Sequence, residues 1–136
     1  MTITLCYSMQ FSDRTAEIKT QLEHSGHLVF ISSFHTEYVE QTPEEIEKRK
    51  LKHKNENDAI GEHWRHINNS DCILVLNYTK NNIENYIGGN VFLEMGFAYV
   101  LGKPIYLLNP IPKMPFYETE IIAMKPIIIN NDLTKI

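Results

Sequence analysis

Short apolar runs and helical patterns alternate along the whole chain. Continuous apolar runs, typical of strands inside a sheet, occur at residues 3–7, 28–31, 71–76, 104–108 and 126–129. Patterns with helical spacing lie between them, at 12–24, 44–68 (with an interruption near 55–61), 91–101 and 117–124. Such alternation predicts right-handed crossover connections and a parallel sheet covered on both sides.

Local signals set several of the expected boundaries. Ser12 is the expected N-cap of the first helix, whose apolar stripe would contain Ala16, Ile18 and Leu22. Pro43 suits the first position of the next helix. The expected fold class is α/β: a flavodoxin-like, doubly wound, five-stranded parallel sheet with helices on both faces, formed by a single domain over residues 1–136.

Glu94 is the one charged residue in the apolar stretch 91–101. Apolar side chains occur on every side of this predicted helix, and a helix of that kind is normally buried. Burying a carboxylate without a partner costs several kcal/mol. Two interpretations remain open: Glu94 faces a cavity and performs chemistry, or it is an ordinary first-turn acid that the helix dipole favours by about 0.3–1 kcal/mol.

Composition narrows the function classes. The chain has 136 residues and a formal net charge of −4, which argues against a surface for nucleic acid polymers. No apolar run approaches the roughly 20 residues of a membrane span, and the start lacks a signal-peptide pattern. Cys6 and Cys72 fall in predicted strands and form no CxxC pair. Buried free thiols fit a reducing cytoplasm, so we expect a cytoplasmic protein without a membrane partner.

Doubly wound sheets bind ligands beyond the carboxyl ends of their strands. The segments that follow those ends are 7–11, 77–90 and Asn109, and Glu94 lies on the helix that leaves the same edge. Gly88, Gly89 and Asn90 would let a ligand approach the backbone closely, or would simply form a turn. The chain contains neither GxGxxG nor GxxxxGK[ST], so no dinucleotide or NTPase fingerprint is present.

Two further clusters have ordinary explanations. The basic run 48–54 could contact phosphates, but it is interpreted as the solvated face of a helix, because acids four residues earlier offer favourable pairs. His63 and His66 have a spacing that can ligate a metal, but no third ligand is evident nearby, so we expect no metal. A single histidine near the pocket could instead act as a proton donor.

Several motifs together carry a family resemblance. They are the run Ser70–Asn77, the segment Tyr86–Asn90, the Glu-Met-Gly-Phe-Ala motif at 94–98 and Gly-Lys-Pro at 102–104. With the start Cys6–Met9, they resemble the nucleoside 2-deoxyribosyltransferase-like family, which includes nucleoside deoxyribosyltransferases and nucleoside 5′-monophosphate N-glycosidases. The resemblance spans nearly the whole chain.

The resemblance implies that Glu94 is a nucleophile that attacks the anomeric carbon and expels the base, without cofactor or metal. Ser8 matches a serine that contacts phosphate in the monophosphate hydrolases. The expected substrate-binding residues are Tyr7, Ser8, Met9, Asn77, Gly88, Gly89 and Asn90. The family also implies a homodimer or higher homo-oligomer whose pocket a neighbouring subunit completes.

The sequence departs from the family pattern at three positions. Tyr7 stands where glycine is usual, Gly88 where many transferases have Asp, and His63 where many members have an acid. His63 is therefore the expected acid/base. Alternatives are a catalytically inactive nucleotide-binding or sensor domain of the same fold, and a flavin carrier. Base identity, ribose or 2-deoxyribose, the need for a 5′-phosphate, and hydrolysis or transfer stay open.

Overall fold

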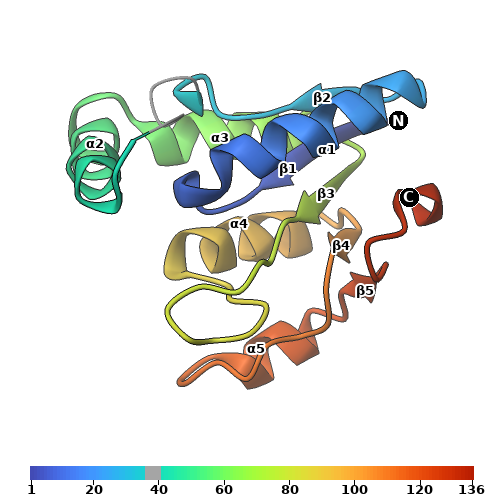
Figure 1. Ribbon diagram of the computed structural model, residues 1–136. Helices are drawn as coiled ribbons and strands as arrows, with labels where there is room; N and C mark the ends of the chain where they lie inside the picture. The colour runs from blue at the N-terminus through green and yellow to red at the C-terminus, as the bar shows by residue number, and fades with distance from the viewer. Residues whose placement is uncertain (36–40) are drawn as a thin grey trace.

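A computed structural model gives the fold of the chain and describes residues 1–35 and 41–136 (Figure 1). Its strands are β1 (Thr2–Cys6), β2 (Leu28–Phe30), β3 (Cys72–Val75), β4 (Ile105–Leu107) and β5 (Ile127–Ile128). They form one five-stranded sheet in the order β2-β1-β3-β4-β5, and all neighbours are parallel. The predicted flavodoxin-like α/β fold is confirmed.

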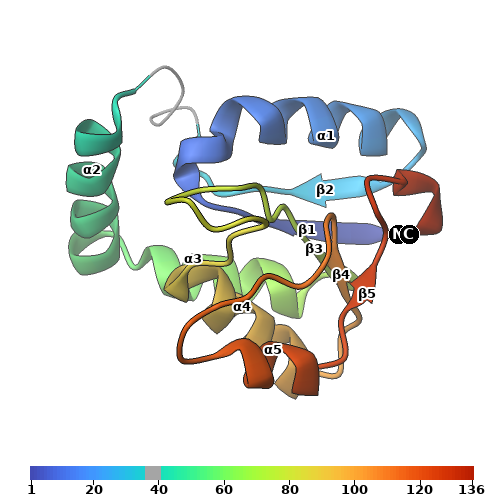
Figure 2. The same ribbon diagram turned by 60° about the horizontal axis from the view of Figure 1, so that its bottom comes forward.

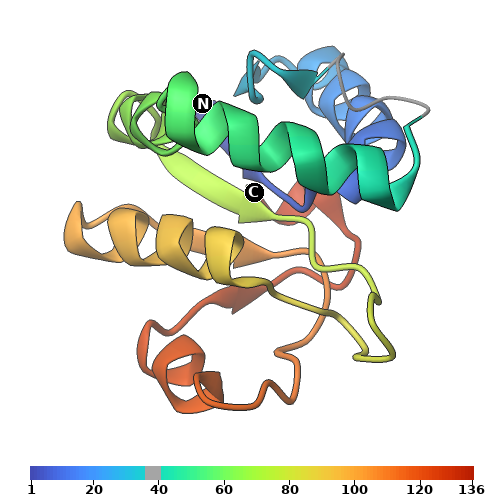
Figure 3. The same cartoon turned by 90° about the vertical axis from the view of Figure 1, so that its left-hand side faces the viewer.

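Helices cover both faces of this sheet. They are α1 (Ser12–His24), α2 (Pro43–Glu56), α3 (Ala59–Asn68), α4 (Gly89–Val100) and α5 (Glu118–Ala123), with short 3-10 turns η1 (Met9–Phe11) and η3 (Leu133–Lys135). In Figure 2, α1 lies on one side of the sheet, and α3, α4 and α5 lie on the other. In Figures 1 and 3, α2 stands beyond the end of the sheet where the strands finish.

Strand residues alternate between two cores, as the period of a strand requires. Ile3, Leu5 and Leu74 pack under α1, whereas Cys6 and Val75 pack against α3, α4 and α5. Ile3, Leu5, Leu74 and Cys6 are fully buried. This alternation places the Cys6 thiol on the α3 and α4 side of the sheet.

The first helix begins differently from the prediction. Its N-cap is Phe11, and Ser12 is already helical because the preceding 3-10 turn lets its hydroxyl donate to the Met9 carbonyl at 2.7 Å. Thr15 and Leu22 are buried, while Ala16 is exposed, so the predicted apolar stripe is wrong at Ala16.

The predicted interruption between 55 and 61 is a sharp break that separates α2 from α3. Asp58 adopts a left-handed conformation with φ of 47° and caps α3, because its carboxylate accepts from the Gly61 N–H at 3.2 Å. A methyl group at Gly61 would collide with that carboxylate. At the other end, α2 begins at Pro43 as predicted, and Thr42 caps it by accepting from the Glu45 N–H at 3.2 Å.

One face of α4 is exposed, contrary to the prediction that this apolar helix is buried all round. Leu93, Tyr99 and Val100 are exposed at 41, 56 and 84%. Glu94, Met95 and Ala98 face inward. The predicted homo-oligomer would explain the exposed face, and it stays a prediction. Within the described ranges, no helix is both long and apolar enough to cross a bilayer.

Candidate functional site

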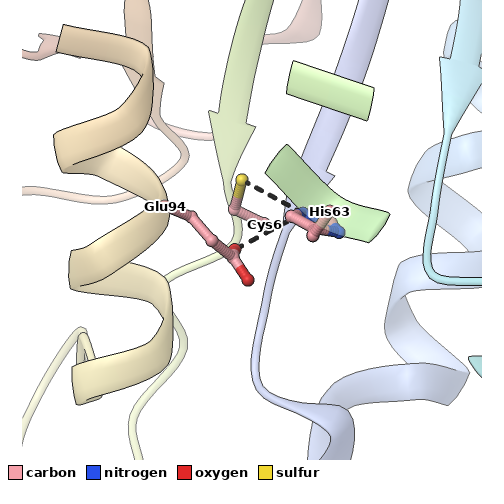
Figure 4. A group of neighbouring side chains, drawn as sticks. All are labelled: Cys6, His63 and Glu94. Carbon is pink, nitrogen blue, oxygen red and sulfur yellow. Dashed lines mark hydrogen bonds and ion pairs between the residues drawn. The ribbon is translucent and has the colours of Figure 1, made fainter. Parts of the chain in front are cut away.

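Glu94 lies inside the molecule, between α4, α3 and the end of β1. It is the sixth residue of α4, so it sits in the second turn, beyond the first-turn position that the helix dipole would favour. Its side chain is 11% exposed and that of His63, from α3, is 8% exposed. Figure 4 shows both side chains pointing toward Cys6. The interpretation of Glu94 as an ordinary first-turn acid therefore fails.

The three side chains are close together. His63 Nε2 lies 3.4 Å from Glu94 Oε2 and 3.6 Å from Cys6 Sγ. The first distance suits an ion pair, yet Glu94 Oε2 accepts no hydrogen bond of good geometry from the described residues. The Glu94 carboxylate is thus close enough to His63 for an ion pair, but no well-formed hydrogen bond fixes its orientation. Sequence reasoning found no further ligating group near His63, and that was wrong because β1 delivers Cys6 and α4 delivers Glu94.

Electrostatics keep the Glu94 carboxyl unusually basic. Burial raises its pKa above the ordinary value, while His63, the Cys6 thiol and the Lys54 charge act in the opposite direction. Burial, with the nearby Glu94 charge, also raises the pKa of Cys6 well above its usual range. The lowering by Lys54, a residue of α2, shows that Glu94 and the basic helix influence the same region.

A pocket of about 260 Å³ opens at the carboxyl edge of the sheet, next to this group. Its lining residues come from four segments: Tyr7, Ser8, Met9; Ser32, Phe34; Lys50, His53, Lys54, Ala59; Lys80, Tyr86, Gly88, Gly89, Asn90. Asn90 precedes Glu94 by one helical turn, and Tyr7 follows Cys6. The buried group therefore adjoins one wall of the pocket. Neither His63 nor Glu94 is among the lining residues.

Six of the seven predicted substrate-binding residues meet in this pocket. They are Tyr7, Ser8, Met9, Gly88, Gly89 and Asn90. The Tyr7 hydroxyl lies 2.8 Å from His35 Nδ1, and burial raises the pKa of Tyr7 strongly. A Cβ at Gly89 would meet open space, which keeps the backbone at the start of α4 accessible.

Asn77 does not line the pocket, contrary to the prediction. Its side chain is fully buried and is used to hold a neighbouring strand end. The amide nitrogen donates to the Asn109 carbonyl at 2.9 Å, and the amide oxygen accepts from the Asn109 N–H at 2.9 Å. Asn77 therefore fixes the loop after β4 to the loop after β3.

The interpretation of the basic run as a solvated face is wrong for three of its six basic residues. Lys50, His53 and Lys54 turn toward the pocket, and Lys80 meets them from the loop after β3. Lys80 Nζ donates to the Ser8 hydroxyl at 3.1 Å. Partial burial and the Lys50 charge lower the pKa of Lys80. Such a cluster of cations suits an anionic group of a ligand.

Sequence reasoning missed these basic residues, as well as Ser32, Phe34 and Tyr86. A signal for the lysines was present, because positions 50, 53 and 54 have the spacing of one helical face. His66 lies beside His63, with an edge contact at 6.0 Å between ring centroids, and its ring also stacks on Phe30 at 5.1 Å.

Comparison with known proteins gives a likeness at the level of the fold. No family model and no curated protein matches the sequence. Among solved structures, the CMP N-glycosidase BcmB of Clostridium botulinum superimposes with a TM-score of 0.53 and 18% identity, over 96% of this chain and 90% of that one. The chain therefore shares its α/β fold with a structurally characterised N-glycosidase.

Proposed function

We propose that this protein cleaves the N-glycosidic bond of a nucleoside 5′-monophosphate, with Glu94 as the nucleophile. The observation that carries the proposal is the composition of one pocket. Lysines gather in its wall, and a desolvated carboxyl lies one helical turn behind Asn90. A phosphate and an anomeric carbon are the two parts of a nucleotide that need those groups.

The chemistry follows from a carboxylate and a sugar. Ionised Glu94 attacks C1′, the C1′–N bond breaks, and its electron pair leaves with the base, which takes up a proton. Water then attacks the ester carbon C1′, which frees Glu94 and gives a sugar 5-phosphate. A second base in place of water would give transfer. Hydrolysis is favoured in this proposal, because a pocket of about 260 Å³ is at the small end of ligand sites.

His63 has a positioning role in this scheme, in place of the acid/base role expected from the sequence. Its Nε2 lies 3.4 Å from the nucleophile itself. Acid and nucleophile in retaining glycosidases are about 5–5.5 Å apart, because the scissile bond lies between them. A histidine this close instead orients the carboxylate and favours its ionised form.

The phosphate subsite is the basic end of the pocket. Lys50, Lys54 and Lys80 approach it from two segments, and the Ser8 hydroxyl, which accepts from Lys80 Nζ at 3.1 Å, lines the same pocket. Gly88 caps α4 with no side-chain hydrogen bond to the first-turn N–H groups. These N–H groups suit an anion. The similar solved structure is that of a CMP N-glycosidase, which agrees with a monophosphate substrate for this chain.

The test is release of free base from a panel of nucleosides and their 5′-monophosphates, followed by chromatography. The parent chain should release base, and Glu94→Gln should lose at least about 10³-fold in kcat, because the step lacks its nucleophile. Glu17→Gln is the matched control, since Glu17 is exposed on α1, across the sheet. Equal rates in parent and Glu94→Gln would refute the proposal.

A second set of variants tests the phosphate subsite. Lys54→Gln and Lys80→Gln should each raise KM for the monophosphate by about tenfold, the size of one charged hydrogen bond, and leave the nucleoside unaffected. Lys52→Gln is the control, because Lys52 is exposed on the same helix and does not line the pocket. Similar effects in all three variants would contradict the assignment.

A binding or sensor domain is the second candidate, and one observation favours it. Glu94 is only 9% exposed and is not itself a lining residue of the pocket. A nucleotide could therefore bind without reaching the carboxylate. Saturable binding of monophosphates, measured by calorimetry, with no base released by the parent chain would establish this alternative.

A further inference from the structure

The structure assigns Cys6, His63 and Glu94 as a site for a single thiophilic divalent cation such as Zn²⁺. A thiol, an imidazole and a carboxylate are the three protein ligand types that zinc prefers. Their ligating atoms all lie within 4.8 Å of one another, and all three residues are buried. They come from three separate elements, β1, α3 and α4, so the fold itself assembles the set.

The distances between the ligating atoms match a tetrahedral ion. With Zn–S of about 2.3 Å and Zn–N and Zn–O of about 2.0–2.1 Å, tetrahedral angles put S and N about 3.6 Å apart and N and O about 3.4 Å apart. The observed separations are 3.6 Å for Cys6 Sγ to His63 Nε2 and 3.4 Å for His63 Nε2 to Glu94 Oε2. The sulfur and the carboxylate oxygen lie within 4.8 Å of each other, and a tetrahedral ion would hold them about 3.6 Å apart.

A buried acceptor without a hydrogen bond independently points to a ligand. Glu94 Oε2 is shielded from solvent, and no hydrogen bond of good geometry reaches it from the residues that the structure describes, although His63 Nε2 lies 3.4 Å away. Such orphaned buried oxygens are uncommon in folded proteins. A cation bound to Oε2 would satisfy it.

Charge balance also favours a divalent ion. One thiolate, one carboxylate and one neutral imidazole carry two negative charges, so Zn²⁺ makes the group neutral. A neutral group costs far less to bury than a charged one. The fourth position would be filled by water, as in zinc sites with three protein ligands.

Occupation of this site and sugar cleavage exclude each other, a consequence that rests on the proposed function. The Glu94 carboxylate that would attack C1′ is the carboxylate that would ligate the ion. Zinc would therefore inhibit the enzyme by occupying its nucleophile, and removal of zinc would restore activity.

Binding is measured on the full chain, freed of metal by chelation and without substrate. The parent should take up one equivalent of Zn²⁺ in competition with a chromophoric chelator. Bound Co²⁺ should give visible bands of tetrahedral intensity and a thiolate charge-transfer band. Cys6→Ala and His63→Gln should each weaken Zn²⁺ binding by at least about tenfold, the size that loss of even a supporting contact produces.

Cys72→Ala is the matched control, because it also removes a buried free thiol from a central strand. It should bind Zn²⁺ as the parent does, and circular dichroism checks that every variant is folded. Absence of stoichiometric binding by the parent, or equal binding by the parent and a folded Cys6→Ala, overturns the inference. The parent chain could bind zinc in a way that requires Cys6 and His63, yet release no base from any nucleotide. That result would support the metal site and refute the proposed function.

Discussion

Replacing Glu94 by glutamine should make the protein more stable at neutral pH. The carboxylate lies 3.4 Å from His63 and is almost fully enclosed. A full unit of positive charge at that distance would attract the carboxylate by about 5 kcal/mol at an effective dielectric constant of about 20, which is an upper limit for this contact. Removal of a carboxylate from water costs several kcal/mol. The raised pKa of Glu94 shows that burial outweighs the attraction.

The expected gain is about 1–2 kcal/mol in the free energy of unfolding, since glutamine keeps the shape but removes the buried charge. Its two amide hydrogens offset part of the gain. For a chain of this size the change corresponds to a rise of roughly 3–8 °C in Tm. Urea denaturation of both proteins, with unchanged m-values, measures it.

The pH dependence of that gain is the sharper test. A carboxyl whose folded pKa is raised favours folding below its unfolded pKa of about 4.3, and that contribution is lost as pH rises through the folded pKa. The two proteins should therefore converge below about pH 4 and separate as pH increases. A destabilised Glu94→Gln at neutral pH, or a difference independent of pH, would refute the reasoning.

Glu62→Gln provides a control of opposite sign. Burial opposes ionisation of Glu62, but two hydrogen bonds from Ser33, at 2.9 and 2.6 Å, and the nearby His66 lower its pKa overall. Its ionised form stabilises the fold above the unfolded pKa, and that contribution is lost as pH falls through the lowered folded pKa. Because Glu62 is partly exposed, Glu62→Gln should lose only about 1 kcal/mol or less at neutral pH.

Three further outcomes are expected. Asn77→Ala should lose about 1–3 kcal/mol in urea denaturation, because the partly buried N–H and carbonyl of Asn109 lose their partners; a neutral effect would contradict the role of Asn77 as a brace. Base release should fall on the acid side at a pH clearly above 4.3, because only ionised Glu94 attacks and burial raises its pKa; a full rate at about pH 4 would exclude a buried nucleophile. Gly102→Ala should cost about 1–2 kcal/mol, because φ is 69° there, whereas Gly96→Ala, inside α4 with open space at its Cβ, should be neutral or stabilising by thermal unfolding.

The sheet could be predicted from the sequence because its strands are short, apolar on both faces and bounded by breakers. Cys72–Val75 is buried throughout, and Gly102 and Pro104 separate α4 from β4. The sequence does not determine which side of the sheet each strand residue faces. The side of the sheet that Cys6 faces depends on the register of β1, and that register is set by tertiary packing.

The site was predictable where a residue contradicts its surroundings. Glu94 is such a residue, because a charge in an apolar stretch requires an explanation. The basic residues of α2 looked ordinary, since this helix stands beyond the sheet and has little apolar surface to mark an inner face. Asn77 looked functional because it follows a strand directly. That position serves equally well to brace a neighbouring loop, and only three-dimensional proximity to Asn109 decides between the two.

The break at Asp58 determines how the pocket-lining residues of α2 are spaced from His63 on α3. On one side of it, Lys50 and Lys54 line the pocket where the proposed function would bind the charged end of a ligand, and on the other side His63 lies beside Glu94, the proposed nucleophile. Asp58 caps α3 by accepting from the Gly61 N–H, and a Cβ at Gly61 would collide with the Asp58 carboxylate. A molecule whose charge lies at a different distance from its reacting carbon would then fit the spacing between these two groups poorly, whatever base it carries.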